Sequence, residues 1–120
     1  MKALNIGIMP REQFQRRALL IASGKLKPKR DEPKIWFGSI KSLSQVLSEQ
    51  NMLLLKLICE HQPETLMELA ELSGRHRGNL SRTLKTMERY GIVELKRQRH
   101  TIKPIAKASQ FTIHYDIHCA

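Results

Sequence analysis

Residues 65–93, TLMELAELSGRHRGNLSRTLKTMERYGIV, contain the local signals that decide the fold. Thr65 followed by Glu68 forms a capping box and predicts the start of a helix. Gly74 predicts its end, because glycine adopts a left-handed turn without a Cβ penalty. A second helix, terminated by Gly91, is predicted by apolar residues at helical spacing, namely Leu80, Leu84 and Met87. Two helices joined by a glycine turn are typical of a helix-turn-helix, which presents its second helix to a nucleic-acid groove.

The outward face of the second predicted helix carries side chains that bind DNA. At about 100° per residue, the direction opposite Leu80 and Met87 holds cations, small residues and an amide. Arg, Asn and Ser side chains read base edges, and Arg and Lys also bind phosphate. Gly78 costs a helix roughly 1 kcal/mol relative to alanine, and a close approach of the backbone to DNA would explain it. We therefore predict DNA contacts from Arg75, Arg77, Gly78, Asn79, Ser81, Arg82 and Lys85. The alternative interpretation is a solvated cationic face, with a glycine tolerated in the first turn.

Charge is segregated along the chain. The net charge is +10 over 120 residues. Residues 75–107 hold ten Lys or Arg against Glu88 and Glu94, which gives +8, whereas residues 48–74 hold five Glu against Lys56, which gives −4. Solubility alone does not require such segregation, but a protein that neutralises phosphates with one face does.

A β-hairpin is predicted directly after the second helix. Residues 92–95 and 101–105 form two β-rich runs, and residues 96–100 form a basic tip between them. Such a hairpin would place Arg97 and Arg99 beside the second helix, within reach of phosphates or of the adjacent minor groove. An ordinary basic hairpin is the alternative interpretation. Pro104 indicates that the returning strand lies at an edge.

These residues resemble those of a known family. GNLSRTLKTMERYGIVELKR is similar to the recognition helix and wing of winged helix-turn-helix regulators of the multiple-antibiotic-resistance and arsenical-resistance repressor types. The larger pattern resembles more closely a small prokaryotic group of DNA-binding regulators, some of which act as antitoxins of toxin–antitoxin pairs. It consists of PKIWF at 33–37, SLSQVLSEQN at 42–51, ELAELSG at 68–74 and NLSRTLKTMERYGIV at 79–93. The resemblance covers roughly residues 33–117 and implies a DNA-binding dimer, with base contacts from Arg77, Asn79, Ser81 and Arg82.

The rest of the chain predicts supporting elements. Residues 52–59 are apolar around nearly the whole helical circumference, which predicts a buried central helix, and residues 39–47 predict a shorter one. Alternating residues predict half-buried strands over 2–9 and 111–117, and residues 11–23 predict an amphipathic helix before a basic linker at 25–33. We expect a mainly α fold with a small β component, a winged helix-turn-helix with extra N- and C-terminal strands. Its expected parts are residues 1–32 for dimerisation or partner binding, 33–107 for DNA binding, and 108–120 as a C-terminal strand.

The apolar faces of these terminal segments need a partner. A single chain could supply it, but extra strands at both ends favour a homodimer that exchanges them between copies. No signal peptide is evident, and two cysteines do not make a disulfide framework, so we expect a cytoplasmic protein. His114, His118 and Cys119 are poor candidates for a metal site, because residues four apart on a strand lie about 13 Å apart. We expect no metal, no cofactor and no enzymatic activity, since the sequence contains no phosphate loop, nucleophile elbow or carboxylate pair.

Three functions fit these patterns. The first is a sequence-specific transcriptional regulator, a repressor or autoregulator, that binds double-stranded DNA at its own promoter. The second is an antitoxin that neutralises a cognate toxin protein by direct binding, with DNA binding as autoregulation. The third is a double-stranded-RNA or ribosome-associated protein. Asn79 and Arg82 favour the first over the third, because the deep, narrow major groove of RNA does not admit a helix.

Overall fold

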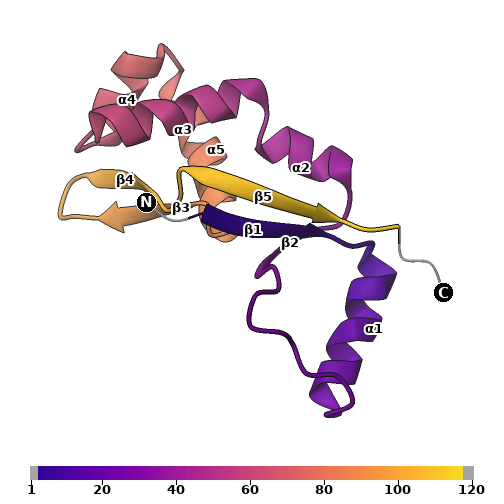
Figure 1. The fold of residues 1–120 in the computed structure, drawn as a ribbon. Coiled ribbons are helices and arrows are strands. Elements are labelled where there is room, and N and C mark those ends of the chain that lie inside the picture. The colour runs from indigo at the N-terminus through magenta and orange to yellow at the C-terminus, as the bar shows by residue number, and fades with distance from the viewer. Residues whose placement is uncertain (1–2, 118–120) are drawn as a thin grey trace.

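The computed structural model describes residues 3–117 as a mixed α/β fold of five helices and five strands (Figure 1). Along the chain these are β1 (Ala3–Ile8), α1 (Arg11–Ala22), β2 (Ile35–Phe37), α2 (Ile40–Val46), α3 (Glu49–His61), α4 (Leu66–Ser73), α5 (Arg77–Arg89), β3 (Val93–Arg97), β4 (Ile102–Ala106) and β5 (Gln110–Tyr115). None of the helices described is long and apolar enough to cross a membrane.

The ends of α4 follow the local signals in the sequence. The Thr65 hydroxyl accepts a hydrogen bond from the Glu68 amide at 3.1 Å, which satisfies one of the unpaired donors of the first turn. The Glu68 carboxylate reaches back to the amide of Glu64, at 3.0 Å, one residue before the cap. Gly74 ends the helix with φ +70°, and Gly91 follows α5 with φ +80°. The predicted Thr65 cap and both glycine stops are therefore confirmed, while the reciprocal bond of the capping box goes to Glu64 instead of Thr65.

Helices α3, α4 and α5 pack with the β3–β4 hairpin around one apolar core. On α3 the buried side chains are Leu54, Leu55 and Ile58, so this helix supports α4 and α5 as predicted. It is not buried all round, however, because Leu53 is 61% exposed and Met52 41% exposed. The prediction that α3 is buried all round is wrong, because only one face of α3 packs against the other helices.

The strands from the two ends of the chain meet in one sheet. Its order is β2-β1-β5, and β1 is parallel to both neighbours, with Ile6 beside Ile35 and Ile113. Ile6 and Ile8 of β1 pack against Phe37 and Leu43 in a second core, on the side of the sheet that α2 covers (Figure 1). The terminal strands were expected to find partners by exchange between two copies, but β1 and β5 pair within one chain. Period-two alternation identifies a half-buried strand and carries no information about its partner.

An aromatic stack joins the two cores. The Phe37 ring, at the end of β2, stacks on the Tyr90 ring with centroids 4.2 Å apart and planes at 15°. Tyr90 is the C-cap residue of α5 and packs partly buried against both clusters. The sheet that contains the N-terminal strand is therefore in direct contact with the end of α5.

Helix α1 rests on the opposite side of the sheet through a few contacts. The Trp36 ring lies over Gly7, its register partner on β1, where an added Cβ would overlap the ring. Phe14 of α1 packs on Trp36 with ring centroids 6.1 Å apart, and the Arg17 guanidinium lies 5.2 Å from the Trp36 ring centroid while it pairs with Glu32. No residue of α1 is buried. This helix is held by one tryptophan and one ion pair.

Replacing Gly7 with alanine should destabilise the fold by about 1–3 kcal/mol, because the methyl group overpacks against the Trp36 ring. Chemical denaturation followed by circular dichroism measures the change. Gly38→Ala is the matched control, since Gly38 is exposed and an added Cβ there meets no atom within 4 Å. Equal stability of the two variants would contradict the proposed packing of Trp36 on Gly7.

Candidate nucleic-acid interface

Helix α5 separates an apolar face from a cationic one. Leu80, Leu84 and Met87 are at most 1% exposed and fix the orientation of the helix. The exposed residues of α5 are all Arg, Lys, Asn or Gly, namely Arg77, Gly78, Asn79, Arg82, Lys85 and Arg89. The predicted Ser81 is half-buried at the margin of this face. Within residues 3–117, the side chains of Arg77, Asn79 and Arg82 make no hydrogen bond or ion pair, so their donors face solvent.

The N-terminus of α5 is capped in a way that the sequence did not predict. His76 is the N-cap residue, and its Nδ1 atom accepts a hydrogen bond from the Gly78 amide at 3.2 Å. An added Cβ at Gly78 would lie 3.4 Å from that nitrogen, an ordinary contact. Nothing within residues 3–117 therefore requires glycine at position 78.

Arg75 lies apart from the other predicted contacts. It precedes α5 and is half-buried, and its guanidinium donates to the Asn51 Oδ1 atom at 3.0 Å. Asn51 also donates to the Val46 carbonyl at 2.9 Å, at the end of α2. Arg75 thus ties the turn before α5 to α3 and α2. No spacing signal could have revealed this contact, because the two residues lie 24 positions apart.

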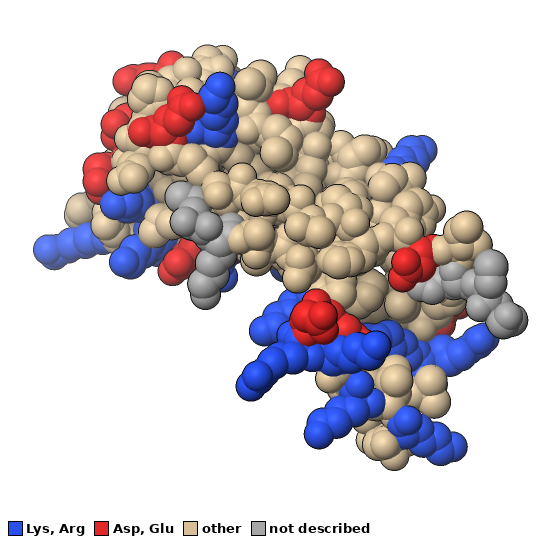
Figure 2. Space-filling model, in the orientation of Figure 1, with Lys and Arg blue, Asp and Glu red and all other residues tan. Residues whose placement is uncertain are grey.

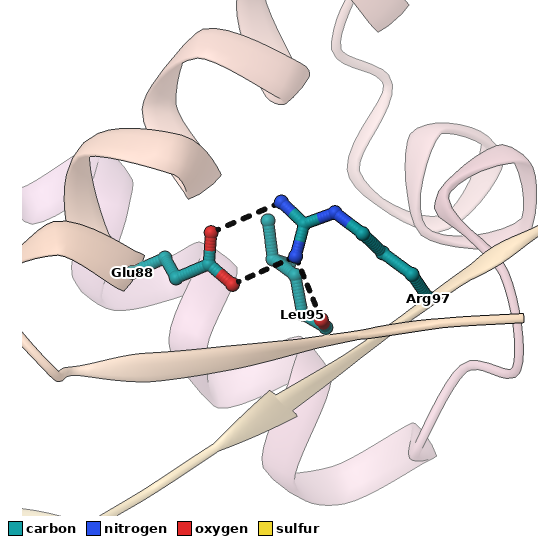
Figure 3. Close-up of polar contacts among 3 residues, drawn as sticks. All are labelled: Glu88, Leu95 and Arg97. Atoms are coloured by element: carbon teal, nitrogen blue, oxygen red, sulfur yellow. Dashed lines mark hydrogen bonds and ion pairs between the residues drawn. The ribbon is translucent and has the colours of Figure 1, made fainter.

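Arg97 holds the hairpin to α5 (Figure 3). Its two terminal nitrogens donate to the two carboxylate oxygens of Glu88, each at 3.2 Å, and one nitrogen also donates to the Leu95 carbonyl at 3.3 Å. The hydrogen bond and the charge of Arg97 lower the pKa of Glu88, and Glu88 in turn raises the pKa of Arg97. The single acidic side chain of α5 is thereby neutralised by the hairpin.

A cationic hollow lies between the hairpin tip and the first turns of α4 and α5. Its volume is about 530 Å³. Arg77 of α5 and Arg97, Arg99 and His100 of the hairpin line it, together with Thr65, Leu66, Met67, Gln98, Thr101 and Ile102. Among residues 3–117 no carboxylate lines this hollow, and a phosphate group there would meet the Arg77 and Arg99 guanidinium groups, while Arg97 is already paired with Glu88.

The surface shows the same partition of charge (Figure 2). Lys and Arg gather around the hairpin, whereas Asp and Glu gather over α3 and α4. A second cationic region covers α1 and the linker that follows it. Residues 11–34 hold eight Lys or Arg against three acidic residues, of which Glu32 pairs with Arg17.

The described residues contain no group of three His, Cys, Asp or Glu that could hold a metal ion. His114 is exposed on β5. His118 and Cys119, the other members of the candidate set in the sequence, lie outside the described residues.

Comparison with known proteins places the chain in a family. The chain belongs to the family described as HVO_A0114, whose model matches residues 46–113. The match begins at the last residue of α2 and runs into β5, so it includes α4, α5 and the hairpin. Neither a curated protein nor a solved structure matches the chain.

Replacing Arg97 with glutamine should raise the pKa of Glu88 toward the ordinary value of a glutamate, because the main hydrogen bond and the nearest positive charge are lost. A carbon-detected NMR titration of the Glu88 carboxyl measures it. Because the folded-state pKa of Glu88 is lowered, the ion pair stabilises the folded state above the unfolded-state pKa and loses this effect as the pH falls through the folded-state pKa.

Arg99→Gln removes the same charge from the same hairpin and serves as the control for this titration. Arg99 makes no hydrogen bond or ion pair within residues 3–117, so this change should leave the pKa of Glu88 almost unaltered. An identical shift in both variants would show that general charge, and not the Arg97 contact, sets the Glu88 pKa.

Proposed function

We propose that this protein is a sequence-specific DNA-binding regulator that inserts α5 into the major groove. In this proposal α4 and α5 act as a helix-turn-helix, and the β3–β4 hairpin acts as its wing. The observation that carries the proposal is the composition of the exposed face of α5, where every exposed residue is Arg, Lys, Asn or Gly. A helix of this kind fits the major groove, which is about 12 Å wide and presents acceptors to Arg and Asn side chains.

The individual residues take different roles in this proposal. Asn79 and Arg82 have unpaired donors on the exposed face, and we assign them to base edges. Lys85 and Arg89 lie further along the same helix and bind phosphate oxygens, as does Arg77 in the hollow beside the hairpin tip. The cationic hollow supports a backbone contact at this point.

The two hairpin arginines, for which the sequence predicts the same role, have separate roles in this proposal. Arg97 is engaged by Glu88 and positions the hairpin against α5. Arg99 lines the hollow without an internal partner and is the residue of the pair that binds phosphate. Arg75 supports the turn through Asn51, so its contribution to DNA binding is indirect.

An antitoxin function is the second candidate and rests on α1. Leu19 is 71% exposed and Leu20 38% exposed on a helix that buries no residue. An apolar helix face of this kind is a common docking site for another protein. We rank it second, because it rests only on exposed apolar side chains of α1, whereas α5 exposes the Arg, Lys and Asn side chains that a DNA-binding helix uses.

Arg82→Ala should cost roughly 1–3 kcal/mol of affinity for the protein's own promoter and relax the base preference at one position. Fluorescence anisotropy with the promoter duplex and a scrambled duplex, over a range of salt concentrations, measures both effects. Wild-type binding should weaken steeply with salt, because bound phosphates release counterions. Lys56→Ala is the control, since it removes one exposed cation from α3, on the acidic side of the molecule. Unchanged base preference in Arg82→Ala, or a flat salt response, would count against the proposal.

Gly78→Ala should separate stability from DNA binding. Alanine favours the helix by up to about 1 kcal/mol, less in the first turn, and the chain has room for the methyl group. The same methyl group should lower affinity for the promoter duplex, because it blocks close approach of the backbone to DNA. Denaturant melts and anisotropy titrations test both halves. Raised stability with unchanged affinity would show that α5 does not approach DNA at Gly78.

A further inference from the structure

Strand β5 leaves one edge of the main sheet open. It pairs with β1 along all six of its residues, and within residues 3–117 its other edge pairs with no strand. Its residues are exposed except for the half-buried Phe111. Soluble proteins usually shorten, cover or charge such edges, because unpaired backbone groups are a template for another strand. Gln110–Tyr115 contains no Lys, Arg, Asp or Glu.

An apolar groove runs beside this open edge. It measures about 350 Å³ and is lined by Ile40, Leu43, Ser44, Leu47, Met52, Phe111 and Ile113. Ile40, Met52 and Ile113 are each between 40% and 48% exposed, and Tyr115 on the same side of β5 is 59% exposed. In Figure 2 the face over β5 and α2 is largely without charged residues. Contiguous exposed apolar surface of this kind marks an interaction site.

The charge of the chain restricts what can cover this surface. Two copies with a net charge of +10 each repel one another wherever their cationic regions approach. The hairpin with α5, and α1 with its linker, are both strongly basic. The β5–α2 face has no charged residue in its groove, so two copies can meet there without bringing two cationic surfaces into contact.

The side chains of β5 also match a copy of themselves. Residues directly opposite in an antiparallel pair point to the same face of the sheet. A two-fold axis at Ile113 places that residue opposite its equivalent and places Phe111 opposite Tyr115. All the apolar side chains of both strands then lie on the groove side, while Thr112 and His114 meet on the other side.

We propose that a second copy of this chain pairs its β5 antiparallel to this edge, with the two-fold axis at Ile113. The two sheets then join into one of six strands, in the order β2-β1-β5-β5-β1-β2. The Tyr115 side chain of each copy extends over the apolar groove of the other. The interface is isologous, so it closes at a dimer.

In the proposed DNA-binding function, this dimer supplies the second α5 helix. Only this consequence rests on the proposed function. Two helices related by a two-fold axis read half-sites about 34 Å apart, or a multiple of that distance. The surface itself follows from β5, the groove and the charge distribution, and does not require DNA.

Sedimentation velocity of the full chain at micromolar concentration, without DNA, tests the surface. Wild type should sediment as a dimer and Ile113→Lys as a monomer, because the substitution places two cations side by side on the axis. Tyr115→Lys is a second variant at a more exposed position and should also shift the equilibrium toward monomer. Circular dichroism confirms that each variant is folded.

Leu19→Lys is the matched control, because it places the same charge on a more exposed apolar residue of α1. This variant should remain a dimer. A monomeric wild type, folded Ile113→Lys and Tyr115→Lys variants that remain dimers, or a Leu19→Lys variant that becomes monomeric would each overturn the proposed interface.

DNA titrations of the same variants separate this inference from the proposed function. Monomeric Ile113→Lys should bind the two-half-site promoter at least tenfold more weakly than wild type while keeping the same base preference, because α5 is unchanged. If wild type is a dimer that Ile113→Lys dissociates but neither binds DNA, the interface stands and the DNA-binding function falls. If wild type binds the promoter and Ile113→Lys remains a dimer, only the interface falls.

Discussion

The burial of one face of α5 determines the arrangement of the rest of the candidate site. Leu80, Leu84 and Met87 are the apolar positions of a helix that is otherwise polar, and all three are closed off from solvent. A helix with one apolar stripe has a single stable orientation against a core. Because that stripe faces α3, α4 and the hairpin, the opposite side must face water. The cations of α5 are exposed as a consequence of packing, and any DNA-binding activity of this face depends on those three side chains.

The arginines around α5 fall into two groups. One group is held by other side chains of the protein, and the other faces solvent without such a partner. Arg75 and Arg97 are held by Asn51 and Glu88, and they fix the turn before α5 and the hairpin after it. An exposed ion pair contributes little to the free energy of unfolding, so the value of the Glu88 contact lies in positioning. It also cancels the single negative charge on α5. The Arg82 and Arg99 side chains have no hydrogen bond or ion pair within residues 3–117, so their donors are available to an external ligand.

The parts of this structure that the sequence predicts are those set by neighbours along the chain. The Thr65 cap, the Gly74 turn and the apolar period of α5 depend on residues within one or two helical turns, so local patterns suffice to place α4, α5 and the exposed cations. Contacts between distant residues could not be predicted. The parallel pairing of β1 with β5, the Trp36 ring over Gly7 and the bond from Arg75 to Asn51 each depend on how the completed elements pack. The exposed Leu53 shows the same limit, because composition gives the hydrophobicity of α3 but not which of its faces finds a neighbour.

The proposed dimer edge and the proposed DNA-binding helix are connected by a short series of packed groups. Strand β5 pairs with β1, the Ile6 and Ile8 side chains of β1 pack with Phe37, and Phe37 stacks on Tyr90 at the end of α5. Buried apolar groups that are closely packed shift little relative to one another. If two copies join through β5, the Phe37–Tyr90 stack therefore transmits the position of the two-fold axis to each α5, and the spacing of two half-sites becomes a property of the sheet. The terminal strands would then set the distance between the two α5 helices of the proposed dimer.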